Sequence, residues 1–227
     1  MHHFWKTSHA FRFALLLALV CLLAFRAVGT AFREGRNRLG ANHTVTLGLA
    51  DYLTLVRGLF ICVLGGFLFS PQPDGWSAWI PGFFYLTVVS IDGIDGFLAR
   101  RLGQASAFGE ILDKEFDGLG TAVATLLAYQ YGKVPVIYLP VAGLYYAFQI
   151  GLWSYQKIGR PVSSLKNSNY RKIVGGLNSV FLSVALWPVW GPPVSFIAAT
   201  ILMLFVIASF IKDWLVVTVA KTQADSG

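Results

Sequence analysis

Four aspartates lie within 26 residues of a chain that is otherwise rich in apolar side chains. They are Asp92, Asp95, Asp113 and Asp117, in the stretch IDGIDGFLARRLGQASAFGEILDKEFDG at residues 91–118. A carboxylate beside hydrocarbon is costly unless a cation meets it. Oxygen ligands from several carboxylates suit hard divalent cations such as Mg²⁺, Mn²⁺ or Ca²⁺. The stretch therefore predicts a metal site.

The spacing of these residues predicts two helices that meet. Positions three or four apart share one face of a helix, and two such sets occur: Asp92, Asp95, Gly96 and Ala99, followed by Gly109, Asp113 and Asp117. The linker RRLGQASAF between them contains a glycine and small polar residues, which favours a tight turn. Two antiparallel helices joined in this way can direct both carboxylate faces into one cleft.

Glycine and arginine beside the carboxylates indicate a phosphorylated ligand. Gly96 and Gly109 lack side chains, so a bulky ligand can approach the helix backbone closely. Arg100 offers a planar fork of donors that suits phosphate. The alternative is that the aspartates are solvated helix ends, the arginine is a topology anchor and the glycines serve helix packing. The consistent spacing of all these positions favours the site.

Composition predicts an all-α, polytopic transmembrane helix bundle. Apolar residues make up 56% of the chain and charged residues 13%, whereas soluble domains carry about 25% charge. A spanning helix needs about 20 mostly apolar residues. Seven hydrophobic segments are apparent, of which the first is short and the last five fit a span best: 11–31, 52–70, 77–98, 114–131, 134–154, 173–190 and 193–219.

Basic residues predict how these segments are oriented. They gather in the joins 32–51, 99–113 and 155–172, whereas the alternate joins are poor in Lys and Arg. Because basic loops face the cytoplasm, we expect a protein of the cell (inner) membrane with its aspartates at the cytoplasmic surface. The net charge of +7 is explained by this rule, and no aromatic-interleaved basic stripe points to nucleic acid. The first segment is expected to be a retained anchor helix, with a cleaved signal peptide as the alternative.

The residues of this stretch resemble the signature of a known family. The pattern D-x2-D-G-x2-A-R-x8-G-x3-D-x3-D is similar to the signature of the CDP-alcohol phosphatidyltransferases, and every position is filled: Asp92, Asp95, Gly96, Ala99, Arg100, Gly109, Asp113 and Asp117. Upstream, Leu53, Thr54 and Arg57 match the family's entry segment, and Asp51 stands where Asn is common. The resemblance covers roughly residues 48–219. It implies a six-helix core at 48–227, preceded by an extra helix and linker at 1–47.

The resemblance also implies a reaction. A phosphatidyl group passes from CDP-diacylglycerol to an alcohol, and CMP leaves. By analogy, Mg²⁺ or Mn²⁺ is held by Asp92, Asp95, Asp113 and Asp117, and Asp117 is the general base. The implied contacts with the CDP-lipid come from the remaining motif residues: Gly96, Ala99, Arg100, Gly109, Arg57 and Thr54. Family members are often dimers, so a homodimer is a possible assembly.

The acceptor alcohol is the least constrained part of the prediction. The basic loop near the motif supplies candidate ligands for an acceptor phosphate: Arg160, Lys166, Arg171 and Lys172. Glycerol 3-phosphate is the first choice, and inositol, inositol phosphate, serine or another polar alcohol are the alternatives. A divalent-cation transporter or sensor is the alternative of another class. It is disfavoured because all four aspartates gather at one membrane boundary and no acidic residue continues a path across the span.

Overall fold

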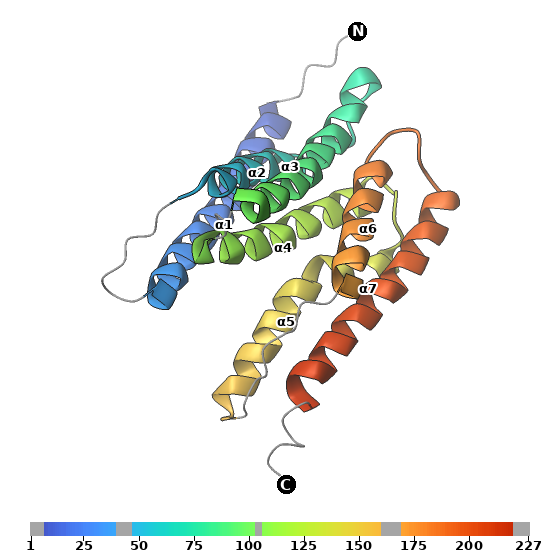
Figure 1. The fold of residues 1–227 in the computed structure, drawn as a ribbon. Coiled ribbons are helices and arrows are strands. Elements are labelled where there is room, and N and C mark those ends of the chain that lie inside the picture. The colour runs from blue at the N-terminus through green and yellow to red at the C-terminus, as the bar shows by residue number, and fades with distance from the viewer. Residues whose placement is uncertain (1–6, 40–46, 103–105, 160–168, 220–227) are drawn as a thin grey trace.

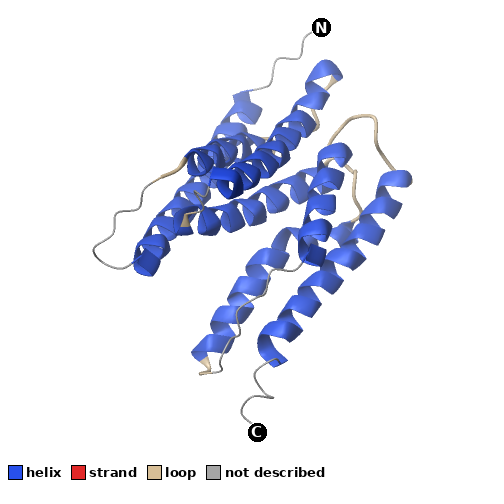
Figure 2. Ribbon diagram, in the orientation of Figure 1, coloured by secondary structure: helices blue, strands red, loops and turns tan. Residues whose placement is uncertain are grey.

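The computed structural model describes residues 7–39, 47–102, 106–159 and 169–219. Within these ranges the only regular secondary structure is helical, and loops and turns join the helices (Figure 1 and Figure 2), so the all-α prediction is confirmed. Two short 3₁₀ helices, η1 (Gly75–Trp79) and η2 (Val136–Tyr138), precede α3 and α5. The seven α-helices correspond to the seven hydrophobic segments: α1 (Thr7–Leu39), α2 (Leu49–Gly66), α3 (Ile80–Leu102), α4 (Ala107–Gln130), α5 (Pro140–Lys157), α6 (Asn169–Ala185) and α7 (Val194–Val219).

Five stretches are long and apolar enough to cross a membrane: Ala10–Asn37, Leu49–Gly66, Gly75–Leu98, Val136–Lys157 and Val194–Thr218. The first segment is therefore longer than the sequence suggested. The two remaining helices, predicted as spans at 114–131 and 173–190, do not meet the same criterion. The reason is that α6 has only 17 residues, while α4 carries charged residues at five positions of its first three turns: Glu110, Asp113, Lys114, Glu115 and Asp117.

The first helix packs along the rest of the bundle, where it contacts α2 and α4 (Figure 1). One face of α1 is buried, and its residues recur at helical spacing: Val20, Ala24, Ala27 and Ala31. On α2, Gly65 lies against the side chain of Val20 and Gly66 lies against the ring of Phe13. Small residues at these positions let the two backbones approach closely, which is the usual way that helices associate in lipid.

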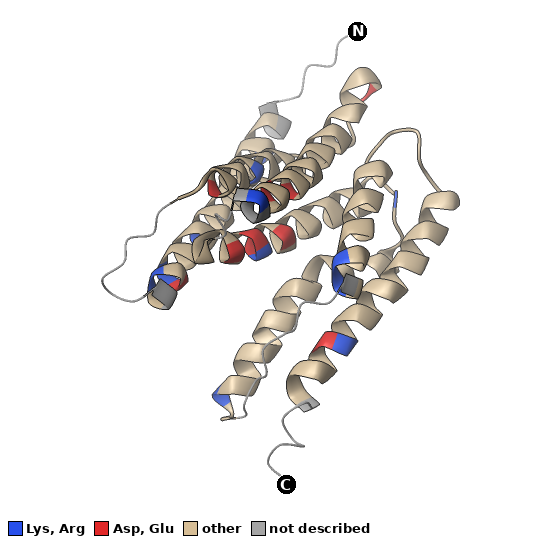
Figure 3. Ribbon diagram, in the orientation of Figure 1, with Lys and Arg blue, Asp and Glu red and all other residues tan. Residues whose placement is uncertain are grey.

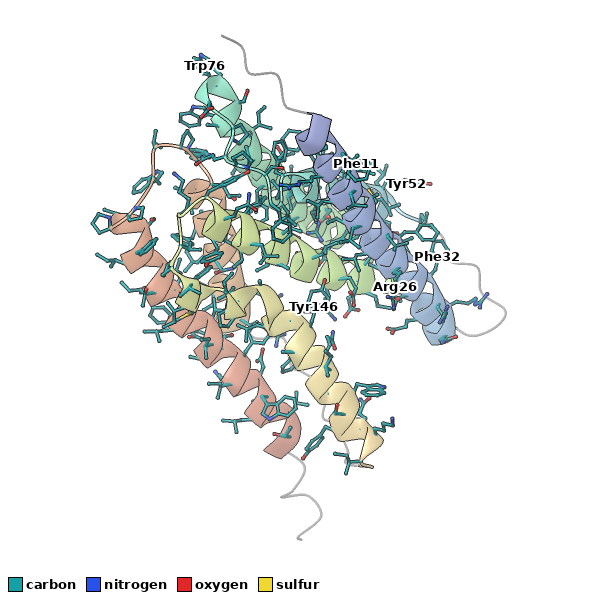
Figure 4. The ribbon with its side chains drawn as sticks, turned by 180° about the vertical axis from the view of Figure 1, so that it is seen from behind. Phe11, Arg26, Phe32, Tyr52, Trp76 and Tyr146 are labelled. Carbon is teal, nitrogen blue, oxygen red and sulfur yellow. The ribbon has the colours of Figure 1, made fainter. Side chains whose placement is uncertain are left out.

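The outer surface of the bundle is apolar. Figure 4 shows this side, with Phe11 and Phe32 of α1 and Tyr52 of α2 at the surface. Each of these three side chains is exposed, Phe11 to 71%. At one tip of the molecule Trp76 of η1 is 92% exposed. An exposed apolar face is what a helix presents to lipid, and exposed tryptophan suits the membrane interface.

The fourth helix runs through the centre of the molecule (Figure 1) and carries three of the eight signature residues. Helices α1, α2 and α3 contact one flank of α4, and α5 and α6 contact the other. The helix begins after Ser106, whose side chain accepts a hydrogen bond from the backbone N–H of Gly109. Five of its residues have no solvent exposure: Leu112, Ala124, Thr125, Leu127 and Ala128. The central position of α4 fixes the motif aspartates where the other helices meet.

Candidate active site

The carboxylates of α3 and α4 come together, as their spacing predicted. Asp92, Asp95 and Asp113 each offer one oxygen atom, and these three atoms lie within 4.8 Å of one another. Figure 3 shows the acidic positions of α3 and α4 facing each other in the middle of the molecule. Asp95 is buried, while Asp92 and Asp113 are half-buried. Asp117, the fourth predicted ligand, is outside this group of three and lies one turn further along α4.

Arg57 of α2 binds three of the four carboxylates. Its guanidinium forms an ion pair with Asp92, and its Nη2 lies 2.8 Å from Oδ1 of Asp113. The same Nη2 donates to the backbone oxygen of Asp113 at 3.1 Å, and Nη1 lies 3.3 Å from Oδ1 of Asp117. The arginine side chain is only 1% exposed. This geometry explains how three of the four carboxylates keep fixed orientations in a largely apolar bundle.

Thr54, one turn before Arg57, fixes the remaining carboxylate. Its hydroxyl donates a hydrogen bond of 2.9 Å to Oδ2 of Asp95, and both residues are buried. From the sequence, Thr54 and Arg57 were expected to contact the CDP-lipid. In the structure their polar groups are directed to the aspartates instead, so a direct contact with the lipid stays a prediction.

The donor set fits a divalent metal ion. The cluster contains only carboxylate oxygens, which Mg²⁺ and Mn²⁺ prefer over softer ligands. Among the described side chains, four carboxylates outnumber the guanidinium of Arg57, and like charges held together in a bundle of low polarity need further positive charge nearby. The family signature and the grouping of Asp92, Asp95 and Asp113 both indicate a divalent-metal site.

A second carboxylate network joins the first turns of α2 and α4. Asp51 is 2% exposed, and its Oδ2 accepts a hydrogen bond of 2.8 Å from the backbone N–H of Gly48. Its Oδ1 accepts one of 2.8 Å from the hydroxyl of Ser106, which in turn caps α4 at Gly109. The space that a side chain at position 109 would need is filled by the Asp51 carboxylate. The close approach of Asp51 therefore offers a second explanation for a glycine at position 109, beside the prediction that Gly109 makes room for a nucleotide.

A cavity of about 430 Å³ opens beside the aspartates. Asp92 of α3 and Asp117 of α4 lie on one side of it, and Arg171 and Lys172 of α6 also line it. Its walls are further supplied by Tyr145 of α5, by Ser209 and Phe210 of α7, and by the polar pair Asn178 and Ser179 of α6. The structure thus brings two of the predicted acceptor ligands into the same cavity as the predicted general base.

Polar contacts also join the helices that surround this cavity. Nη1 of Arg171 lies 3.2 Å from Oδ2 of Asp213 on α7, so this predicted acceptor ligand is already paired. The hydroxyl of Tyr145 donates to Oε1 of Glu115 at 3.0 Å and accepts from Gln149 at 3.1 Å. These contacts hold α5, α6 and α7 in place around the cavity while leaving its interior open.

Some predicted site residues fall beyond what is described. Arg160 and Lys166 lie outside the described residues. Gly96, Ala99 and Arg100 continue helix α3, but the side chains of Ala99 and Arg100 are likewise outside the described part of the chain.

Sequence reasoning missed three participants. The first two are Asp51, which links the first turns of α2 and α4, and its partner Ser106. A serine directly before a helix is a known capping signal, so the sequence did hold a clue to Ser106. The third is Asp213, whose pairing with Arg171 spans 42 residues and left no signal in the local sequence.

Comparison with known proteins agrees with the signature. Residues 47–220 match the family model of CDP-alcohol phosphatidyltransferase. The CDP-diacylglycerol–glycerol-3-phosphate 3-phosphatidyltransferase of Yersinia enterocolitica is 34% identical over 98 residues, which are 42% of this chain and 52% of that protein. The enzyme of the same name from Pseudomonas fluorescens is 33% identical over 84 residues, 37% of this chain and 42% of that protein.

A relative named for another acceptor also matches. CDP-diacylglycerol–inositol 3-phosphatidyltransferase 1 of Arabidopsis thaliana is 28% identical over 101 residues, 44% of this chain and 42% of that protein. The chain spans about half the length of the curated relatives it matches, or less.

Proposed function

Because the chain belongs to the CDP-alcohol phosphatidyltransferase family, we propose that it transfers a phosphatidyl group from CDP-diacylglycerol to a small polar alcohol. The observation that carries this proposal is the grouping of Asp92, Asp95 and Asp113 beside a cavity that also contains Asp117. In the reaction, the alcohol oxygen bonds to the lipid-side phosphorus, the phosphorus–oxygen bond to CMP breaks, and the proton of the alcohol leaves. The products are a phospholipid and CMP.

The chain's own residues divide this work. Asp92, Asp95 and Asp113 would hold Mg²⁺ or Mn²⁺, and such an ion would supply charge neutralisation on the diphosphate. Asp117 lines the cavity, so its carboxylate is available to accept the proton of an alcohol bound there. Arg57 and Thr54 orient the carboxylates through the bonds described above. Gly96, Ala99 and Arg100 remain our assignment for the nucleotide, with Gly109 beside them.

For the acceptor we propose glycerol 3-phosphate. Arg171 and Lys172 line the same cavity as Asp117, and cationic side chains suit a phosphorylated alcohol. Two of the relatives named above carry glycerol 3-phosphate in their names. Inositol is the second candidate, supported by the Arabidopsis relative and by the neutral polar side chains of Asn178 and Ser179 in the cavity. Assembly as a homodimer in the cell (inner) membrane, with the cleft facing the cytoplasm, completes the proposal.

The test is a CMP-release assay with the purified protein in detergent. CDP-diacylglycerol is supplied with Mg²⁺ or Mn²⁺, with EDTA in a parallel series, across glycerol 3-phosphate, inositol, inositol phosphate and serine. The lipid product is identified by mass spectrometry. We expect metal-dependent CMP release with glycerol 3-phosphate alone and a product of the corresponding mass. CMP release with inositol alone would make inositol the acceptor in place of glycerol 3-phosphate. No CMP release with any alcohol from folded protein would overturn the proposed function.

A further inference from the structure

A buried carboxylate lies apart from the four signature aspartates and is explained by no step of the proposed reaction. Asp51 is 2% exposed, and both of its oxygens accept hydrogen bonds of 2.8 Å, one from Gly48 and one from Ser106. A buried carboxylate is costly unless such donors meet it. The positive ends of two helices also converge on it, because Asp51 lies in the first turn of α2 and Ser106 caps α4. The carboxylate is therefore held where the two helices begin.

This link sits one turn from the cluster on both helices. Along α2, Thr54 and Arg57 follow Asp51 at intervals of three residues, and both are buried on the same side. Along α4, Asp113 follows Gly109 at an interval of four. A rigid contact between the two first turns thus determines where Arg57 meets Asp113 in the next turns. Helices are stiff over such short distances, so a shift at the first contact is passed to the second.

We propose that Asp51 is a positioning residue, which acts through Ser106 to hold α4 against α2 and so sets the position of Asp113 in the carboxylate cluster. Gly109 belongs to the same contact, because a side chain at this position would collide with the Asp51 carboxylate. Gly109 is therefore required for Asp51 to approach α4. Its relevance to catalysis rests on the proposed function, but its effect on the metal site does not.

The test compares four variants with the wild type in detergent: Asp51→Asn, Asp51→Leu, Ser106→Ala and, as control, Asp74→Asn. Asp74 is an exposed carboxylate before η1 with no side-chain capping bond. Asparagine at position 51 can still accept from Gly48, and its amide can donate to the Ser106 hydroxyl, whereas leucine does neither. Ser106→Ala keeps the bond between Asp51 and Gly48 and removes both the link between the helices and the side-chain cap at Gly109. The readouts are Mn²⁺ affinity, from the paramagnetic resonance of free Mn²⁺, and the thermal midpoint in EDTA.

We expect Asp51→Asn and Asp74→Asn to bind Mn²⁺ within about threefold of the wild type. Asp51→Leu and Ser106→Ala should bind it about tenfold or more weakly, as is typical when a group that orients metal ligands is removed. Wild-type affinity in folded Ser106→Ala would overturn the proposal. Equal losses in Asp51→Asn and Asp51→Leu would also overturn it, because Asp51 would then act by its charge. Mn²⁺ binding as expected without CMP release would refute the proposed function and leave this inference standing.

Discussion

The two flanks of helix α4 are built differently. On the flank that faces α1, α2 and α3, glycines and carboxylates are in close contact with their neighbours: Gly58 lies against the ring of Phe116, and Asp51 fills the space beside Gly109. On the flank that faces α5 and α6, Gly118 also lies against the ring of Tyr145, but a cavity of about 430 Å³ opens there and is lined by Asp117 of α4 and Arg171 of α6. The first flank is closed by packing and ion pairs, and the second combines close packing with an open cavity.

The contrast separates two tasks of one site. The closed flank holds Asp92, Asp95 and Asp113 through Arg57 and Thr54, and it contains every described residue of the family signature. The open flank presents Arg171, Lys172 and Asn178 of α6 to the cavity, which the signature residues Asp92 and Asp117 also line. We propose that the carboxylate cluster serves the step common to the family, and that the α6 wall of the cavity is where acceptors can differ.

The largest effect is expected at Asp117, which like Asp92 belongs to both flanks. It pairs with Arg57 on one side and lines the cavity on the other. Asp117→Asn keeps the shape and removes the proton acceptor, so CMP release should fall by roughly 10³-fold, within the usual range for a general base. The measurement is the initial rate of CMP release with saturating Mn²⁺.

The control for this variant is Glu110→Gln, which neutralises an exposed carboxylate on the same helix. It should retain the wild-type rate. An Asp117→Asn protein that keeps more than a tenth of the wild-type rate would remove Asp117 from the role of general base.

Loss of Arg57 should weaken the closed flank. Arg57→Leu leaves three carboxylates without their guanidinium. Breaking a fully buried ion pair in this way lowers the free energy of unfolding by about 3–5 kcal/mol. Because the aspartates are about half exposed to solvent, we expect a loss of roughly 2 kcal/mol. The variant should unfold at a lower temperature than the wild type in EDTA. The difference should shrink in Mn²⁺, because a bound cation replaces part of the lost charge.

Thermal unfolding of Arg57→Leu in both conditions checks this expectation. An equal loss of stability with EDTA and with Mn²⁺ would show that the arginine and the metal do not share the same carboxylates.

A pair of glycine substitutions probes the packing of the two flanks directly. A Cβ atom at position 58 would lie 2.5 Å from Cε2 of Phe116, whereas one at position 175, in the wall of the cavity, would meet nothing within 4 Å. Gly58→Ala should therefore destabilise the protein by about 1–3 kcal/mol, the usual cost of overpacking. Gly175→Ala should be neutral or stabilising by up to about 1 kcal/mol, because alanine favours helix. Equal thermal midpoints for the two variants would contradict the difference between the flanks.

The sequence was sufficient for the parts of the site that depend on local periodicity. Spacings of three and four residues placed Asp92 with Asp95, and Gly109 with Asp113, on the correct faces, because helix geometry repeats regularly. The match of the signature predicted the family, which the comparison confirmed. The seven hydrophobic segments likewise correspond to the seven α-helices of the described residues.

Contacts between distant segments could not be predicted in the same way. Arg57 was assigned to substrate phosphate, but its bonds to Asp92 and Asp113 depend on how α2 crosses α3 and α4. The helix α4 begins seven residues before the predicted segment at 114, because Ser106 caps a first turn that hydropathy alone treats as loop. The cavity is lined by residues from five helices, and local sequence patterns do not predict which distant helices pack together.

The most direct test of the division between the flanks is to measure KM for both substrates in Lys172→Gln, once the assay above has given the acceptor. Lys172 lines the cavity, and a charge-assisted bond to an acceptor phosphate is worth about 1.5–3 kcal/mol. We predict that KM for glycerol 3-phosphate rises about tenfold or more while KM for CDP-diacylglycerol stays at the wild-type value, with Lys114→Gln, an exposed lysine paired with Glu110, unchanged in both. A rise in KM for CDP-diacylglycerol, or no change in either constant, would contradict the assignment of the acceptor to the open flank.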